Sequence, residues 1–255
     1  MRLESIPEPL KMLKNPPKEL NFIGDTLLLE LPKVAVVGSR KASTYTKECV
    51  EVLCNVLKSA NICVVSGGAI GVDIAAHKAA MPKTIGVFAS GLDIIYPSQN
   101  RATIGEIYAK GLALSEYDEG EPPLAYRFLE RNRIVVGLCE ALVVAQADLK
   151  SGSMQSARLA NELNIPVYVL PQRMGESSGT NFLLANRKAE LIDDYYKFAS
   201  LFGEVKEQKI DDDIVKFCKD GVSLDDALAK FGDIIYEYEL DGLIEISNLR
   251  VKSVL

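Results

Sequence analysis

Residues 34–41 read Val-Ala-Val-Val-Gly-Ser-Arg-Lys, and residues 62–71 read Ile-Cys-Val-Val-Ser-Gly-Gly-Ala-Ile-Gly. Each stretch is a continuously apolar run that passes directly into glycine and hydroxyl or basic side chains. A continuous apolar run, unlike an alternating one, is typical of a strand covered on both faces, as in a parallel sheet. We therefore predict two buried parallel strands whose carboxyl ends carry polar, glycine-containing loops.

Four further apolar runs continue this pattern along the chain. They lie at 84–88, 112–114, 141–145 and 167–170, and successive runs begin about 25 residues apart, as strand, crossover helix and strand require. The segments 47–59, 100–110 and 154–164 between them have the spacing of amphipathic helices. The predicted fold class is α/β, with a doubly wound, mostly parallel sheet over residues 33–205.

The two ends of the chain depart from this rhythm. Residues 1–32 contain five prolines and are predicted to form an irregular N-terminal extension beside the sheet, not a domain. Residues 206–255 are predicted to form a small winged-helix domain. Its expected elements are helices at 211–219, 223–230 and 234–240, with Ser223 as an N-cap, and a hairpin at 243–246 and 249–254 turning at Ser247-Asn248.

Composition limits the kinds of site that the chain can form. Its five cysteines include no Cys-x-x-Cys pair, which favours reduced thiols over disulfides or zinc ligands. A single histidine, His77, excludes sites that need two. No apolar run is long enough for a membrane span or a signal peptide, so a cytoplasmic protein without membrane contact is expected.

The net charge of −6 argues at first against nucleic-acid binding, which needs Lys and Arg. The charge is unevenly distributed, however. Residues 206–255 hold seven basic and twelve acidic residues, so the remaining 205 residues are nearly neutral. The large domain can therefore still carry a local basic patch, whereas the acidic C-terminal domain is expected to repel DNA.

Three loops at the predicted carboxyl edge of the sheet have the residue types of anion sites. Glycines let an anion approach the main chain, hydroxyls donate hydrogen bonds and basic side chains supply charge. The candidates are Gly38, Ser39, Arg40 and Lys41; Ser66, Gly67 and Gly68; and Lys150, Ser151, Gly152 and Ser153. Helix capping and tight turns explain any one such loop equally well, but three on one edge favour anion binding.

Neither common nucleotide-binding signature is complete. Gly67-Gly68-x-x-Gly71 is not Gly-x-Gly-x-x-Gly, and no Gly-Lys-Ser/Thr sequence occurs. We therefore expect no dinucleotide or ATP site, no metal and no cofactor.

A second group of candidates surrounds Phe128, which is flanked by arginines. Arginine binds phosphate bidentately, and an exposed phenylalanine can stack on an unpaired base. The group comprises Arg127, Phe128, Arg131, Asn132 and Arg133. The alternative is that Phe128 is a core residue and that Glu130 pairs with one of the arginines.

Catalysis is not indicated. His77 follows Asp73 by four residues, so the two can hydrogen-bond on one helix face as a structural pair. No serine or cysteine is positioned by sequence as a nucleophile for His77. Glu116 can be a lone acid or base, but capping or pairing with an arginine explains it as well.

Taken together, these segments resemble the DprA/Smf family between about residues 16 and 189. The motifs that carry the resemblance are Val37-Gly38-Ser39-Arg40, Ser66 to Asp73 with Ala76-His77, Gly91-Leu92-Asp93 with Tyr96-Pro97 and Asn100, Leu114 to Tyr117, Arg131-Asn132-Arg133, and Ser151-Gly152-Ser153. The resemblance implies an extended Rossmann-like domain that binds single-stranded DNA. It also implies a homodimer that loads a RecA-type recombinase during natural transformation.

Carried over to this sequence, the family's DNA-contacting loops fall on residues 38–40 and 66–71, and its Arg-Asn-Arg segment falls on 131–133. The sequence departs from the family at Gln146-Ala147, Pro171-Gln172 and Pro82-Lys83, all in loops.

Two other functions stay open. One is a nucleotide phosphoribohydrolase of the lysine-decarboxylase-like group, although its Pro-Gly-Gly-x-Gly-Thr motif is missing. The other is a scaffold that binds a small anion in the cleft and partners through the winged helix.

Overall fold

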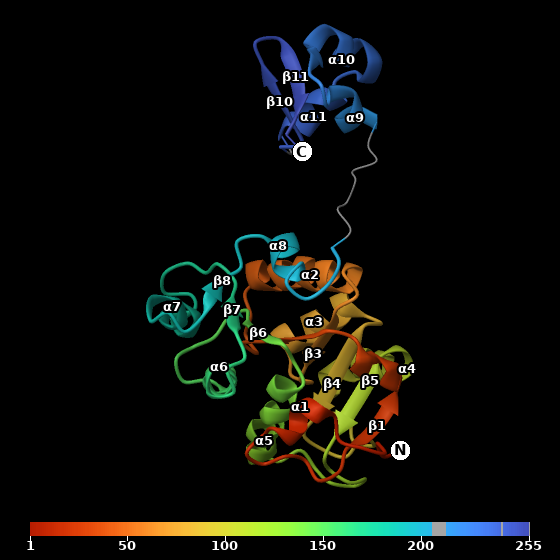
Figure 1. Cartoon of the computed structure of the whole chain (residues 1–255), viewed down its shortest axis with the longest axis vertical. Helices are drawn as coiled ribbons and strands as arrows, with labels where there is room; N and C mark the ends of the chain where they lie inside the picture. Colours follow the sequence, from red (N-terminus) through yellow and green to blue (C-terminus); the bar gives the residue numbers. More distant parts are fainter. Residues whose placement is uncertain (206–212, 241, 255) are drawn as a thin grey trace. The chain divides into compact units, whose positions relative to one another are not determined.

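The structure, a computed structural model, describes residues 1–205, 213–240 and 242–254. It divides into two compact units, Met1–Val205 and Lys206–Leu255. The first unit contains an eight-stranded sheet of order β1-β5-β4-β3-β2-β6-β7-β8, in which only the β1–β5 pair is antiparallel (Figure 1). The strands are β1 (Asn21–Gly24), β2 (Lys33–Val37), β3 (Cys63–Ser66), β4 (Thr84–Phe88), β5 (Leu112–Ser115), β6 (Ala141–Val144), β7 (Val167–Val169) and β8 (Glu190–Leu191). The predicted fold class is confirmed.

Helices cover both faces of this sheet. Alternate strand residues point to opposite faces, so Val34 and Val36 pack against one helical layer, while Ala35 and Val37 pack against the other. The first layer contains α2 (Thr44–Ser59), α3 (Val72–Ala80), α4 (Arg101–Lys110) and α8 (Tyr195–Ala199). The second contains α1 (Glu8–Lys11), α5 (Ala125–Gly137), α6 (Gly152–Glu162) and α7 (Ser178–Ala185). Within the described ranges, no helix combines the length and apolarity needed to cross a membrane.

The strand order reverses between β2 and β6. From β2 the chain builds outward through β3, β4 and β5, and it then returns to place β6 on the other side of β2. In a doubly wound sheet, the loops at the carboxyl ends of the two strands at this reversal diverge and leave a crevice. The fold therefore places a crevice beyond Val37 and Val144.

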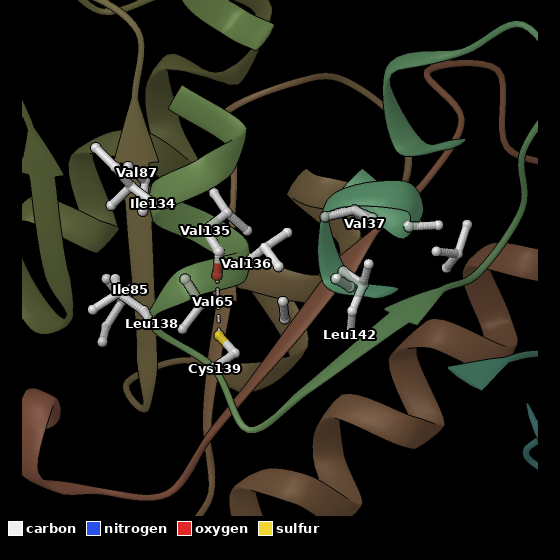
Figure 2. Packing of buried hydrophobic residues seen from close by; sticks show 14 of the residues in the cluster. Val37, Val65, Ile85, Val87, Ile134, Val135, Val136, Leu138, Cys139 and Leu142 are labelled. Atoms are coloured by element: carbon white, nitrogen blue, oxygen red, sulfur yellow. Dashed lines mark hydrogen bonds between the residues drawn. The ribbon is translucent and has the colours of Figure 1, made fainter. Parts of the chain in front are cut away.

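Packing against the sheet fixes α5 in place. Figure 2 shows Ile134 beside Val87, Leu138 beside Ile85 and Val135 near Val65, and all six residues are buried. The helix cannot rotate without exposing this face to water. The polar residues on its other faces consequently hold defined positions.

Residues 1–32 belong to the same core. They form α1, β1 and the 3₁₀ helix η1 (Thr26–Glu30), and β1 extends the sheet beside β5. Leu10 and Leu13 are buried against Gly137 of α5, where a Cβ would lie about 3.0 to 3.1 Å from their methyl groups. The segment predicted as an irregular extension thus contributes an edge strand and a packed helix to the first unit.

The described residues of the second unit form three helices and a three-stranded antiparallel sheet. Its elements are α9 (Asp213–Cys218), β9 (Val222–Ser223), α10 (Leu224–Phe231), α11 (Ile234–Leu240), β10 (Ile244–Ser247) and β11 (Arg250–Ser253). Ser223 caps α10 by accepting a hydrogen bond from the Asp226 amide at 3.1 Å, as predicted. Asn248 and Leu249 have positive φ and form the two-residue hairpin loop. Residues 211 and 212 of the predicted first helix lie outside the described residues.

We expect Leu10→Ala to lower the free energy of unfolding of the protein by about 2–5 kcal/mol, because it opens a cavity between the N-terminal segment and α5. Leu10 is 0% exposed, whereas its neighbour Met12 is 82% exposed and makes a matched control. Denaturant unfolding of both variants measures the difference. Equal, small losses for Leu10→Ala and Met12→Ala would show that the segment is not part of the core.

Candidate nucleic-acid interface

A cleft of about 580 Å³ lies at the carboxyl ends of β2 and β6. Its walls come from the loops after β2, β3 and β6, from α5 and from the start of α6. The predicted residues that line it are Gly38, Ser39, Arg40, Gly67, Phe128, Arg131, Asn132, Ser151, Gly152 and Ser153. Three loops and a helix that are far apart in the sequence thus meet at the reversal of strand order.

Glycines allow the loops after β2 and β3 to interlock. Gly71 has a φ of +89°, and a Cβ there would overlap the Ser39 carbonyl oxygen. A Cβ on Gly38 would lie 2.6 Å from Cγ2 of Val72, whose amide donates to the Ser39 carbonyl. These glycines therefore have a packing role, which fixes the position of Arg40 at the mouth of the cleft.

The floor of the cleft holds a buried arginine and a buried aspartate. The Arg131 guanidinium donates to the Val87 carbonyl, and a Cβ on Gly67 would overlap both this guanidinium and Oδ2 of Asp73. Burial raises the pKa of Asp73 to about 6, against the opposing effect of the nearby Arg131 charge. Burial lowers the pKa of Arg131, since it disfavours the charged form of this group as well. The absence of a side chain at Gly67 is what lets these two groups lie together.

One wall of the cleft is aromatic. The Arg40 guanidinium carbon lies 5.7 Å from the ring centroid of Phe128, within cation–π range, and the Tyr96 ring centroid is also 5.7 Å from that of Phe128. Tyr96 is 47% exposed and Phe128 is half-buried. These three residues, here called the stacking platform, form a surface on which a flat, electron-rich group can pack.

Another wall of the cleft is the N-terminus of α6. Ser151 caps the helix, since its Oγ accepts from the Met154 amide at 3.3 Å and donates to the Asp148 carbonyl at 2.7 Å. Its hydroxyl is thereby occupied. The first-turn amides of Gly152 and Ser153, at the positive end of the helix dipole, remain the groups suited to an anion.

Two of the predicted arginines are paired elsewhere. Arg127 donates to the Glu121 carboxylate and lies 4.4 Å from the Tyr117 ring centroid. Arg133 makes a bidentate pair with Glu116, with hydrogen bonds of 2.7 and 2.6 Å. Neither arginine lines the cleft.

Four other predicted residues also lie outside the cleft lining. Ser66 is buried, and its hydroxyl donates to the Val36 carbonyl at 2.6 Å. Gly68 is buried against Phe88, and Lys41 and Lys150 are exposed. The charged residues that line the cleft are Arg40, Arg131, Asp73 and Asp148, so its lining is balanced and not strongly basic.

His77 does not form the expected pair with Asp73. Its Nε2 lies 2.7 Å from the Gly67 carbonyl oxygen and its Nδ1 lies 2.7 Å from Oγ1 of Thr84. A carbonyl can only accept, so the proton of the neutral imidazole is on Nε2. His77 consequently fixes Gly67 from behind the floor of the cleft.

Sequence reasoning missed Tyr96 and Asp73 as cleft residues. Tyr96 follows β4 at the same edge of the sheet as the predicted loops, so the rule that located those loops also applies to it. Asp73 was assigned to His77 because both lie on α3. Only the course of the Gly67 loop reveals that the Asp73 side chain faces Arg131 instead.

We expect His77 to stay neutral down to a pH of about 4, because burial lowers the pKa of its imidazole to about 4. The unfolded imidazole binds a proton below about 6.5. His77 therefore contributes stability that is fully present above pH 6.5 and lost as the pH falls toward 4, by up to about 3 kcal/mol. The chain has one histidine, so NMR titration of its ring is unambiguous. A midpoint near 6.5 in the folded protein would contradict the burial of this ring.

Comparison with known proteins places the chain in a family. The description of that family is DNA recombination-mediator protein A, and it matches residues 2–203. The chain is 40% identical over 183 residues to DNA processing protein DprA of Streptococcus pneumoniae, covering 70% of this chain and 64% of that protein. It is 34% identical over 218 residues to protein Smf of Synechocystis, covering 80% and 55%. The chain thus spans about half to two thirds of the length of these relatives.

Two solved structures share the fold. DNA processing protein A of Helicobacter pylori, described for its single-stranded DNA binding mode, has a TM-score of 0.77 and 46% identity over 79% of this chain and 94% of its own. DprA of Streptococcus pneumoniae has a TM-score of 0.73 and 37% identity over 78% and 71%. Since the family match extends over most of the first unit, the chain belongs to the DNA recombination-mediator protein A family.

Proposed function

We propose that the cleft binds a short stretch of single-stranded DNA without chemically changing it. The observation that carries this proposal is that the stacking platform of Arg40, Phe128 and Tyr96 lines the same cleft as the amide-rich start of α6. An unpaired base stacks on aromatic rings, while its phosphate accepts from main-chain amides and arginine. Membership of the family supports the same function.

Phosphate binding in this proposal depends on dipoles more than on net charge. Arg40 is the exposed cation of the cleft lining, and the amides of Gly152 and Ser153 provide the positive end of α6. Lys41 and Lys150 are exposed, and they add a longer-range attraction that salt screens. None of these phosphate contacts reads a base, so most positions of a bound strand carry little sequence preference.

We further propose that strand binding serves to load a RecA-type recombinase and that the protein works as a cytoplasmic homodimer. The family description as a recombination mediator supports the first part. A cleft of this size holds only a few nucleotides, and a second copy on the same strand would raise the apparent affinity through effective concentration. Release of free base from nucleoside monophosphates would contradict a purely binding role.

We expect Arg40→Ala to weaken binding of a labelled oligothymidylate about tenfold, because a charged hydrogen bond to phosphate is lost. The slope of log affinity against log salt should fall by about 1. Arg158→Ala removes an exposed arginine of α6 outside the cleft lining and is the matched control. Fluorescence anisotropy over a salt series measures both quantities. Equal effects of the two variants would place the binding site elsewhere.

We expect Phe128→Ala to lower the affinity for the same oligonucleotide by about 1–3 kcal/mol while leaving the salt slope unchanged, because stacking involves no counterion release. Phe128→Trp should retain binding. The control is Phe182→Ala, which removes a 42% exposed ring of α7 that does not line the cleft. A reduced salt slope for Phe128→Ala, or no loss of affinity, would contradict the role of the stacking platform.

A further inference from the structure

Two buried, oppositely charged side chains lie together on the floor of the cleft without a direct salt bridge. Arg131 is 5% exposed and Asp73 is 7% exposed, and both line the cleft. Among the ion pairs of residues 1–205, none joins these two residues. In addition, Nε of Arg131 is buried without a hydrogen-bond partner. The Asp73 carboxyl accepts from the Ala69 amide, and Arg131 donates to the Val87 carbonyl, yet both side chains line the cleft and Nε of Arg131 has no partner. Because buried charges and buried polar atoms are costly unless they are paired, a ligand that adds hydrogen bonds to both groups is favoured at this floor.

The two groups offer complementary hydrogen-bonding capacity at one place. Both flank the Cα of Gly67, which keeps them side by side. An ionised carboxylate only accepts, with room for about four hydrogen bonds, and a guanidinium only donates. A ligand that fits them must therefore present donors next to an acceptor along one edge.

The stacking platform lies on the same side of α5 as this pair. Phe128 and Arg131 are three residues apart and therefore share a helix face, and both line the cleft. A base that stacks on Phe128 can direct one edge toward the floor. The deeper position thus receives the edge of a nucleobase and not its phosphate.

We propose that this floor reads a single guanine in the bound strand, with Asp73 accepting from its N1–H and N2–H groups and Arg131 donating to its O6. Guanine is the common base whose pairing edge carries two adjacent donors beside an acceptor. Thymine presents one donor, N3–H, between two carbonyl oxygens. At least one of these oxygens would face the carboxylate, and two acceptors cannot form a hydrogen bond. Adenine and cytosine present a single amino group, so they offer the carboxylate fewer donors than guanine does.

This inference rests on the proposed function, because it names one base position within the same cleft. The remaining contacts are stacking and main-chain amides, which accept any base. A strand would therefore bind in many registers, with a preference for the register that places a guanine on the floor.

The test is competition binding by fluorescence anisotropy with oligothymidylates that carry one central substitution. Replacing one thymidine by deoxyguanosine should tighten binding about tenfold or more, as a bidentate base contact does. Deoxyinosine, which lacks the N2 amino group, should recover only part of that gain. Deoxyadenosine and deoxycytidine should bind no better than thymidine.

Asp73→Asn should abolish the preference for guanine, measured within the variant as the ratio of its affinities for the deoxyguanosine-containing strand and for plain oligothymidylate. Asp193→Asn, at an exposed carboxylate outside the cleft lining, should keep the preference and is the matched control. Equal affinity of the wild type for all substitutions, or a preference for adenine or cytosine, would overturn the guanine assignment while leaving strand binding intact. Failure of every oligonucleotide to bind would overturn the proposed function as well.

Discussion

The floor of the cleft depends on the fact that residue 67 is a glycine and has no side chain. The space that a Cβ would take is filled by the Arg131 guanidinium and the Asp73 carboxyl, and the Gly67 carbonyl is held by His77. Burial raises the pKa of Asp73 and lowers that of His77, so each group is shifted toward its neutral form. The two shifts oppose each other in the pH dependence of stability. Asp73 favours folding at low pH, where it is protonated, whereas His77 favours it at higher pH, where the imidazole is neutral.

The periodicity of α5 explains why three closely spaced arginines do not form a basic patch. Phe128, Arg131 and Asn132 face the cleft, whereas Arg133 pairs with Glu116 away from it and Arg127 pairs with Glu121. These outer pairs tie α5 to the loop that follows β5, and the apolar face of the helix packs on the sheet. The arginines outside the cleft thereby orient the residues inside it, and they have no free charge to offer a phosphate.

The sequence predicted β2 to β7 to within about one residue, because each of these strands is a continuously apolar run. It did not predict β8, which has only two residues, both exposed. It also predicted the meeting of three loops at one edge, since parallel strands end together. It did not predict which side of a helix faces the cleft, because Arg127 and Arg131 are equivalent until the packed face of α5 is known. β1 escaped prediction for a different reason. Its four residues are each only half-buried, and they lie next to β5 only after a long connection.

A cleft with balanced charge suits a single strand better than a duplex. Because two arginines and two aspartates line the cleft, attraction to phosphate alone is weak. The acidic second unit, whose α11 carries Glu237 and Glu239 and no basic residue, adds no such attraction. In the proposed function, the additional free energy comes from stacking, which needs an exposed base face. A duplex hides those faces in its own stack and offers only phosphates and groove edges to a protein. Under this proposal, the aromatic wall and the buried Asp73–Arg131 floor contribute only when the bases are unpaired. A preference for single strands over duplex DNA is then the expected consequence of the weak charge of the cleft.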